Sequence, residues 1–149
     1  MKKVFIDSDI FVRDLRYPRD ARTESNRKFI EKIKSKKGLG GTSIFNLLEV
    51  CGILSFNLSS EELLQLYGDF INYYKVQILF PADANGNLQY DIAKIFGQIQ
   101  KKQSLGDAQI SYVVERFASQ LSCFVSWNAP HFTEKLPLLV RTPEEFLNL

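Results

Sequence analysis

The sequence predicts an α/β fold, a three-layer sandwich with a mainly parallel central sheet. Short apolar segments of strand character alternate with longer segments in which apolar residues recur at helical spacing. Their order is strand, helices, strand, helices, strand, helix, which is typical of βαβ units with helices on both faces of a parallel sheet. The length of 149 residues and the hydrophobic content of 45% suit a single domain, residues 1–149, with a substantial core.

The first strand is predicted over residues 3–6, and its apolar run ends at Asp7. Residues 13–22 are expected to form a charged loop around Pro18. A helix is expected over about 23–36, where apolar residues recur at helical spacing among charged ones. A glycine-rich stretch then ends this helix and leads into a short extended segment.

The helix predicted over about 43–55 is apolar on nearly all sides, so it should be buried. Its one charged residue is Glu49, which is also the only charged residue between Leu39 and Ser60. An isolated carboxylate in a protein interior costs roughly several kcal/mol unless it is paired or bound to a metal. Glu49 is therefore expected to serve a metal or an active site, unless it faces solvent or pairs with an arginine from elsewhere.

The second half of the chain continues the alternation of helices and strands. A capping box at Ser59–Glu62 opens a helix that runs to about Tyr74. The later elements are expected as strand 75–80, loop 82–87, helix 88–103, a helix with Asp107 in its first turn that runs to about 121, strand 122–126, strand 138–140, and a short helix capped by Thr142.

Positive charge is concentrated in one segment. Residues 13–37 hold ten Lys/Arg and four Asp/Glu, a net charge of +6, although the whole chain carries only +2. A basic segment on a body rich in carboxylates indicates an anionic polymer as partner. A solvated helix face is the alternative interpretation.

Four polar residues are predicted to meet at one edge of the sheet. Asp7 and Asn128 follow strands, Asp107 lies at a helix start, and Glu49 lies on the apolar helix. Ligands of open α/β sheets bind outside the carboxyl ends of the strands. An oxygen-only pocket suits Mg²⁺ or Mn²⁺, and such a site with an anionic polymer substrate indicates phosphodiester hydrolysis. Helix capping is the alternative role for Asp7 and for Asp107.

The sequence resembles the PIN-domain ribonucleases, and within them the VapC toxins of VapBC toxin–antitoxin pairs. The resemblance rests on Val-Phe-Ile-Asp7-Ser-Asp, Thr-Ser-Ile-Phe-Asn-Leu-Leu-Glu49-Val, Gly-Asp107-Ala-Gln-Ile, Phe-Val-Ser126-Trp-Asn128-Ala-Pro-His-Phe132 and the closing Arg-Thr-Pro-Glu-Glu-Phe. Each motif is short, but their order covers essentially the whole chain. The helix after Asp107 departs from the family's small residues.

The resemblance implies a PIN-like fold and a Mg²⁺- or Mn²⁺-dependent endoribonuclease. It matches Asp7, Glu49 and Asp107 to the family's metal-binding acids. Asn128 matches the fourth catalytic position, which is Asp in many members and Asn in others, and Ser126 matches a hydroxyl residue that is usually Thr. The family further implies an RNA substrate, a homodimer, and neutralisation by a small antitoxin protein.

Several other residues are candidates for supporting roles. Asp9 is expected to reach the pocket or to hold an arginine beside it, whereas turn chemistry explains Asp83. Trp127 is expected to anchor its loop or to stack on a base. His131 is expected to pack or hydrogen-bond in its loop rather than act as a base. The phosphate contacts expected for a ribonuclease are Arg13, Arg16, Lys28 and Lys32.

Other functions remain open at this stage. A non-catalytic PIN-like module that binds RNA or protein is the first alternative. Asp7-Ser8-Asp9 also resembles the opening of haloacid-dehalogenase-type phosphatases, although that scheme gives Glu49 no role.

The cellular location expected from the sequence is the cytoplasm. Cys51 and Cys123 lie inside apolar runs, as buried thiols of a reducing compartment do. No apolar run has the length of a membrane span or the form of a signal peptide, so no membrane association is expected.

Overall fold

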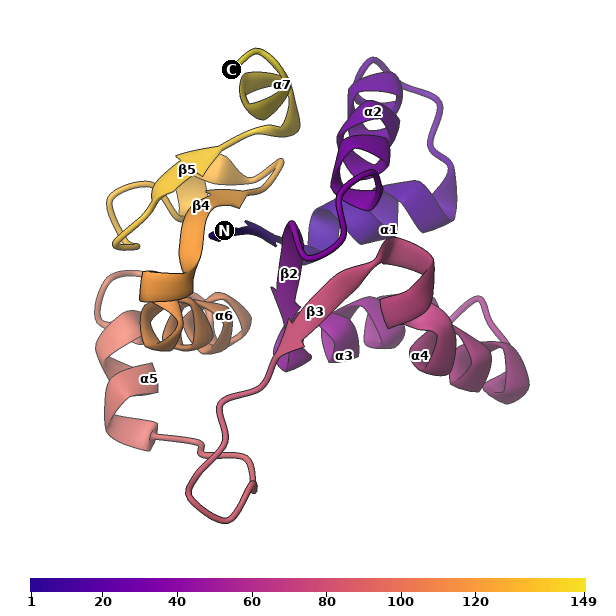
Figure 1. The fold of residues 1–149 in the computed structure, drawn as a ribbon. Helices are drawn as coiled ribbons and strands as arrows, with labels where there is room; N and C mark the ends of the chain where they lie inside the picture. The colour runs from indigo at the N-terminus through magenta and orange to yellow at the C-terminus, as the bar shows by residue number, and fades with distance from the viewer.

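The central sheet has five strands in the order β3-β2-β1-β4-β5, and every neighbouring pair is parallel. The computed structural model describes residues 1–149 (Figure 1). The strands are β1 (Lys3–Ile6), β2 (Gly40–Ser43), β3 (Val76–Leu79), β4 (Leu121–Val125) and β5 (Leu139–Arg141). The helices are α1 (Ser8–Arg16), α2 (Arg22–Lys34), α3 (Ile44–Leu54), α4 (Ser60–Tyr74), α5 (Ile92–Ile99), α6 (Leu105–Arg116) and α7 (Pro143–Leu147), with 3₁₀ turns at Ala118–Gln120 and Ala129–His131.

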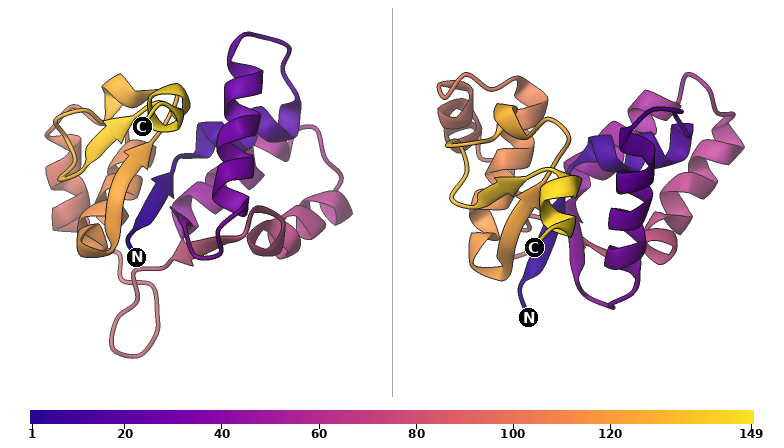
Figure 2. Two further views of the ribbon diagram at one scale, coloured as in Figure 1. Left: turned by 45° about the horizontal axis from the view of Figure 1, so that its top comes forward. Right: turned by 90° about the horizontal axis from the view of Figure 1, so that it is seen from above.

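Helices cover both faces of the sheet, which confirms the predicted three-layer α/β architecture (Figures 1 and 2). One core forms between the sheet and α1 to α4 with α7, and the other between the sheet and α5 with α6. Alternate residues of β1 serve the two cores: Val4 and Ile6 face the first, and Phe5 faces the second. Both faces of a parallel sheet are thus buried.

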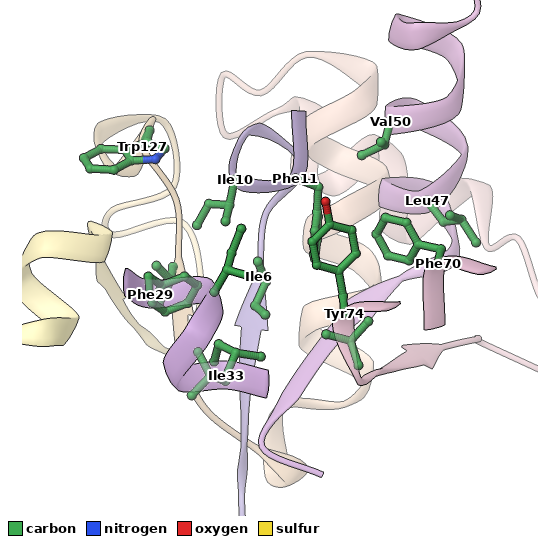
Figure 3. Close-up of a cluster of buried hydrophobic side chains, with 14 of the residues drawn as sticks. Ile6, Ile10, Phe11, Phe29, Ile33, Leu47, Val50, Phe70, Tyr74 and Trp127 are labelled. Atoms are coloured by element: carbon green, nitrogen blue, oxygen red, sulfur yellow. The ribbon is translucent and has the colours of Figure 1, made fainter. Parts of the chain in front are cut away.

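An aromatic cluster joins α1 to α4 in the larger core (Figure 3). The Phe11 ring lies 4.8 Å from the rings of both Phe70 and Tyr74, in edge-to-face geometry. Tyr74 is buried, and its hydroxyl donates a 2.6 Å hydrogen bond to Asp14 Oδ2. These contacts hold α1 firmly against the rest of the protein.

The prediction of a loop over 13–22 is wrong for residues 13–16, because they continue α1. Only residues 17–21 connect α1 to α2. The apolar side chains of Ile10 and Phe11 bury one side of α1, and this burial stabilises a helix whose remaining residues are mostly charged.

Three further boundaries differ from the sequence prediction. The helix expected over 88–103 spans only Ile92–Ile99, and it begins at Ile92 because Asp91 caps it through a hydrogen bond from the Lys94 amide. The helix expected to reach 121 ends at Arg116, after which β4 begins at Leu121. The longest helix, α4, has 15 residues, and no helix has the length and apolar composition that crossing a bilayer requires.

The polar side chains of α6 that depart from the resembled family hold the long connection between β3 and α5. Gln109 donates a hydrogen bond to the Tyr90 hydroxyl, and the Tyr112 hydroxyl donates to the Gln89 carbonyl. Their residue types therefore have a structural explanation outside the cavity described below.

The close approach of α2 to β2 generates a stability prediction at Gly40. A Cβ there would lie 2.6 Å from Ile33 Cγ2 and 3.0 Å from Val76 Cγ1, whereas at Gly41 the nearest atom is 3.5 Å away. We expect Gly40→Ala to destabilise the protein by ~1–3 kcal/mol through overpacking. Gly41→Ala, the matched control, should change stability by less than ~1 kcal/mol. Urea unfolding measures both, and equal losses would contradict this account.

Candidate active site

A cavity of about 300 Å³ opens at the carboxyl edge of the sheet, where the sequence predicted a site. It contains all four predicted catalytic residues together with Asp9 and Arg16. Its lining residues are Asp7, Ser8, Asp9, Val12, Arg16, Glu49, Ile53, Asp107, Asn128, His131 and Phe132. Residues separated by more than a hundred positions in sequence therefore share one small space.

Asp7 lies directly after the central strand and is only 6% exposed. Its Oδ1 accepts a 2.8 Å hydrogen bond from the Ser8 amide, so Asp7 is also the N-cap of α1. Its Oδ2 accepts a 2.8 Å bond from the Ser126 hydroxyl at the end of β4. Capping and a place in the cavity, which the sequence posed as alternatives for Asp7, occur together.

Asn46 orients Asp7 from the other side, and sequence reasoning missed it. Its amide nitrogen donates to Asp7 Oδ1 at 3.2 Å and to Ser8 Oγ at 2.8 Å, and the side chain is fully buried. Asn46 is the third residue of a capping box whose cap is Ser43. The Ser-x-x-Asn spacing was the available signal, because a capping residue there is held rigidly at the helix start.

Two carboxylates compete for the single hydroxyl proton of Ser126. Ser126 Oγ lies 2.8 Å from Asp7 Oδ2 and 3.1 Å from Asp9 Oδ2, yet a serine hydroxyl donates only one hydrogen bond. Asp9 Oδ2 also accepts from the Asn128 amide, while Asp9 Oδ1 is buried without any partner. The two acids therefore share one hydroxyl donor, and one carboxylate oxygen of Asp9 has no donor at all.

The electrostatics of the cavity follow from this crowding. Burial raises the pKa of Asp7 well above its usual value, and the negative charge of nearby Asp9 raises it further. Burial likewise raises the pKa of Asp9 and of the half-buried Asp107. Each shift means that the ionised form lacks the stabilisation that water would provide.

Glu49 and Asp107 approach the cavity from α3 and α6. A Cβ at Gly106 would lie 3.3 Å from Glu49 Oε2, so the absent side chain leaves room for this carboxylate beside the first turn of α6. His131 Nδ1 lies 3.9 Å from Asp107 Oδ2. The expected burial of the whole helix is wrong, because one side of α3, including Leu48 at 52% exposure, faces solvent. Glu49 itself is half-buried and lines the cavity.

The four predicted phosphate contacts do not lie together. Arg16 lines the cavity, whereas Arg13 forms an ion pair with Asp20. Lys28 pairs with Glu24 along α2, and Lys32 lies over the Phe146 ring of α7.

Trp127 anchors its loop. The indole nitrogen donates a 2.8 Å hydrogen bond to Asn26, and the side chain is buried. The turn chemistry expected of Asp83 is also present, since its Oδ1 accepts from the Asn85 and Asn87 amides.

The donor set of the cavity fits a hard divalent cation. All candidate ligands are oxygens, and the unpartnered Asp9 Oδ1 beside Asp7 is the kind of group a cation would stabilise. No three His, Cys, Asp or Glu side chains are close enough to form a complete protein cage. This arrangement suits Mg²⁺ or Mn²⁺, which bind through one or two carboxylates and keep several waters. Asp7, Glu49 and Asp107, the ligands that the resemblance implied, all line this cavity, but they do not form a ready three-carboxylate site.

Solved VapBC structures from two bacteria share the fold of this chain. The DNA-bound VapBC structure from Salmonella typhimurium matches with a TM-score of 0.61 at 17% identity, over 96% of this chain and 99% of that one. VapBC from Rickettsia felis, bound to a fragment of promoter DNA, gives 0.62 at 14% identity, over 93% and 97%. No protein-family model and no curated protein sequence matches the chain.

A third similar structure is a Mycobacterium tuberculosis VapC toxin described as cleaving the sarcin-ricin loop. It matches with a TM-score of 0.57 at 14% identity, over 89% of this chain and 95% of that one. At these identities the comparisons show that the chain shares the fold of these VapBC and VapC structures.

The charge conflict at Asp7 predicts that its removal stabilises the metal-free protein. In Asp7→Asn, the amide oxygen can still cap α1, and the new NH₂ can donate to Ser126, which frees that hydroxyl for Asp9. At neutral pH we expect a gain of ~1 kcal/mol, or about 3 °C in melting temperature. Calorimetric melting in EDTA measures it.

The pH dependence of this gain has a definite sign. A carboxyl with a raised folded-state pKa destabilises the fold at pH values above that pKa, and the penalty disappears below the unfolded-state value of about 4. The gain should therefore shrink as the pH falls toward that value. If Asp7→Asn melted at a lower temperature than the wild type at neutral pH, that result would contradict the proposed charge conflict at Asp7.

Proposed function

We propose that this chain is a divalent-metal-dependent endoribonuclease, the toxin of a toxin–antitoxin pair. The observation that carries the proposal is the convergence of Asp7, Glu49, Asp107 and Asn128 in one oxygen-lined cavity at the carboxyl edge of the sheet. The shared fold with the VapC toxins supports it, since one of those structures is of an RNA-cleaving toxin. The PIN-like sequence motifs fall on the same four residues.

The side chains of the cavity would divide the work of phosphodiester hydrolysis. A bound Mg²⁺ or Mn²⁺ would supply a water of lowered pKa and would neutralise charge on the phosphate. Hydrogen bonds from Asn46 and Ser126 hold the Asp7 carboxylate, which would be the first ligand of the ion, and Glu49 and Asp107 line the same cavity. Arg16 stands at the same cavity as a cation for the phosphate.

The proposed partners follow from the similar structures and from the surface. Two of the similar structures are of VapBC bound to DNA, and the VapC toxins that the sequence resembles pair with a small antitoxin, so we propose a small antitoxin for this chain. A homodimer would cover apolar side chains that α5 and the start of α6 now expose, namely Ile92, Phe96 and Leu105 at 57–68% exposure. The two cysteines are buried and unbonded, which suits the proposed cytoplasmic location.

One observation favours a non-catalytic binding module as the second candidate. Asn128 has an uncharged amide at the position that is Asp in many members of the resembled family, and its side chain is exposed at the cavity. A phosphatase of the haloacid-dehalogenase type receives no support, because Glu49 lines the same cavity as Asp7 and would have no role in it.

The central test is cleavage of total RNA with Mn²⁺, with Mg²⁺ and with EDTA. We expect cutting with either metal, none with EDTA, and a loss of more than ~100-fold in Asp7→Asn, since changes to outer-shell residues alone cost ~10–100-fold. Asp83→Asn is the matched control, because it makes the same chemical change in a turn outside the cavity and should cut normally. Intact metal binding without cutting under any condition would favour the binding module.

Asn128→Asp should tighten Mn²⁺ binding. Two unit charges ~4 Å apart interact by about 4 kcal/mol at an effective dielectric of ~20, and exposure of this side chain reduces that figure. A several-fold gain in affinity is therefore expected by isothermal titration calorimetry. An unchanged affinity would place Asn128 outside the metal's surroundings.

A further inference from the structure

We propose that Arg22 and Arg16 form a phosphate-binding shelf, which holds the backbone of single-stranded RNA beside the scissile bond. The inference rests on the proposed ribonuclease function and assigns a role to Arg22, which the sequence did not single out. Four observations carry it: a second cavity, the positions of residues along one side of α1, the absence of an ion-pair partner for Arg16 and Arg22, and the anchoring of Trp127.

The second cavity, of about 320 Å³, adjoins the catalytic one. The two share Asp9, Val12, Arg16 and Asn128 as lining residues. The lining is completed by Arg13, Pro18, Arg22 and Trp127. A chain of nucleotides with one phosphate at the metal would therefore extend into this space.

Most of the residues that line both cavities come from one side of α1. Asp9, Val12, Arg13 and Arg16 have the spacing i, i+3, i+4, i+7, which places them along one side of a helix. Ile10 and Phe11 project into the core from the other side. Helix α1, which Asp7 caps, thus connects the acidic site to the basic shelf.

Only two of the three arginines are free to bind a phosphate. Arg13 Nη1 lies 2.6 and 2.7 Å from the two carboxylate oxygens of Asp20. Arg16 and Arg22 are exposed, and neither guanidinium forms an ion pair or a hydrogen bond within the protein. Free guanidinium donors are suited to bidentate contact with phosphate oxygens.

Trp127 holds Arg22 in place. The guanidinium carbon of Arg22 lies 5.1 Å from the centre of the indole ring, and that of Arg13 lies 5.6 Å away. The indole ring is held in position, because it is buried and its nitrogen donates a hydrogen bond to the buried Asn26. Stacking on a fixed ring orients Arg22 before RNA arrives, which lowers the entropy lost on binding. Trp127 therefore supports a cation rather than a base.

The test is the salt dependence of RNA binding, measured without cleavage. Fluorescence anisotropy of a labelled single-stranded RNA of mixed sequence in EDTA gives the slope of log K against log salt for the wild type and Arg22→Gln. Loss of one phosphate contact should reduce the magnitude of the slope by ~0.7 and weaken binding at low salt. Arg27→Gln removes the same charge from the same helix outside both cavities and should match the wild type.

The outcomes separate this inference from the proposed function. An unchanged slope in Arg22→Gln, an equal loss in Arg27→Gln, or no RNA binding by the wild type would each overturn the shelf. If circular dichroism shows that Arg22→Gln is unfolded, Arg16→Gln is judged by the same criteria. A wild type that binds RNA with the expected difference yet cuts nothing with Mn²⁺ would refute the ribonuclease and leave the shelf standing.

Discussion

The candidate site depends on like charges held together at the end of the central strand. Asp7 and Asp9 share the single proton of the Ser126 hydroxyl, and one oxygen of Asp9 has no partner. Burial raises the pKa of both acids, because the surrounding groups do not fully stabilise their ionised forms. A divalent cation is the simplest group that would resolve the conflict, which explains why stability and proposed activity make opposite demands on Asp7.

The sheet order makes this conflict possible. Because β1 is central, its carboxyl end is flanked by the ends of β2 and β4, and each neighbour supplies one orienting side chain. Asn46 follows β2 in the first turn of α3, and Ser126 follows β4 directly. Two buried hydrogen-bonding partners from opposite sides fix the Asp7 carboxylate, as a ligand must be fixed if it is to bind a metal in one geometry.

Helix α1 carries residues of the acidic site and of the basic shelf along one side, and it packs into the core with another side. Phe11 packs against Phe70 and Tyr74, and this packing keeps Asp9 and Arg16 in position. Under the proposed function, the acids would hold a cation and the arginines a polyanion, and the two adjoining cavities would form one path for the substrate. The aromatic cluster of the core therefore determines how accurately the functional side chains are placed.

The sequence by itself determined the order of strands and helices and the positions of the four site residues along it. Periodicity and strand ends report local environment, and Asp7, Asp107 and Asn128 stand where strands end or helices start. Only the tertiary structure showed that residues 13–16 are helical, that Glu49 is half-buried, and that Asn46 and Arg22 contact the site region. These facts depend on what lies opposite each residue after folding, since a helix with few apolar residues becomes stable, and an arginine becomes oriented, only through contacts with distant parts of the chain.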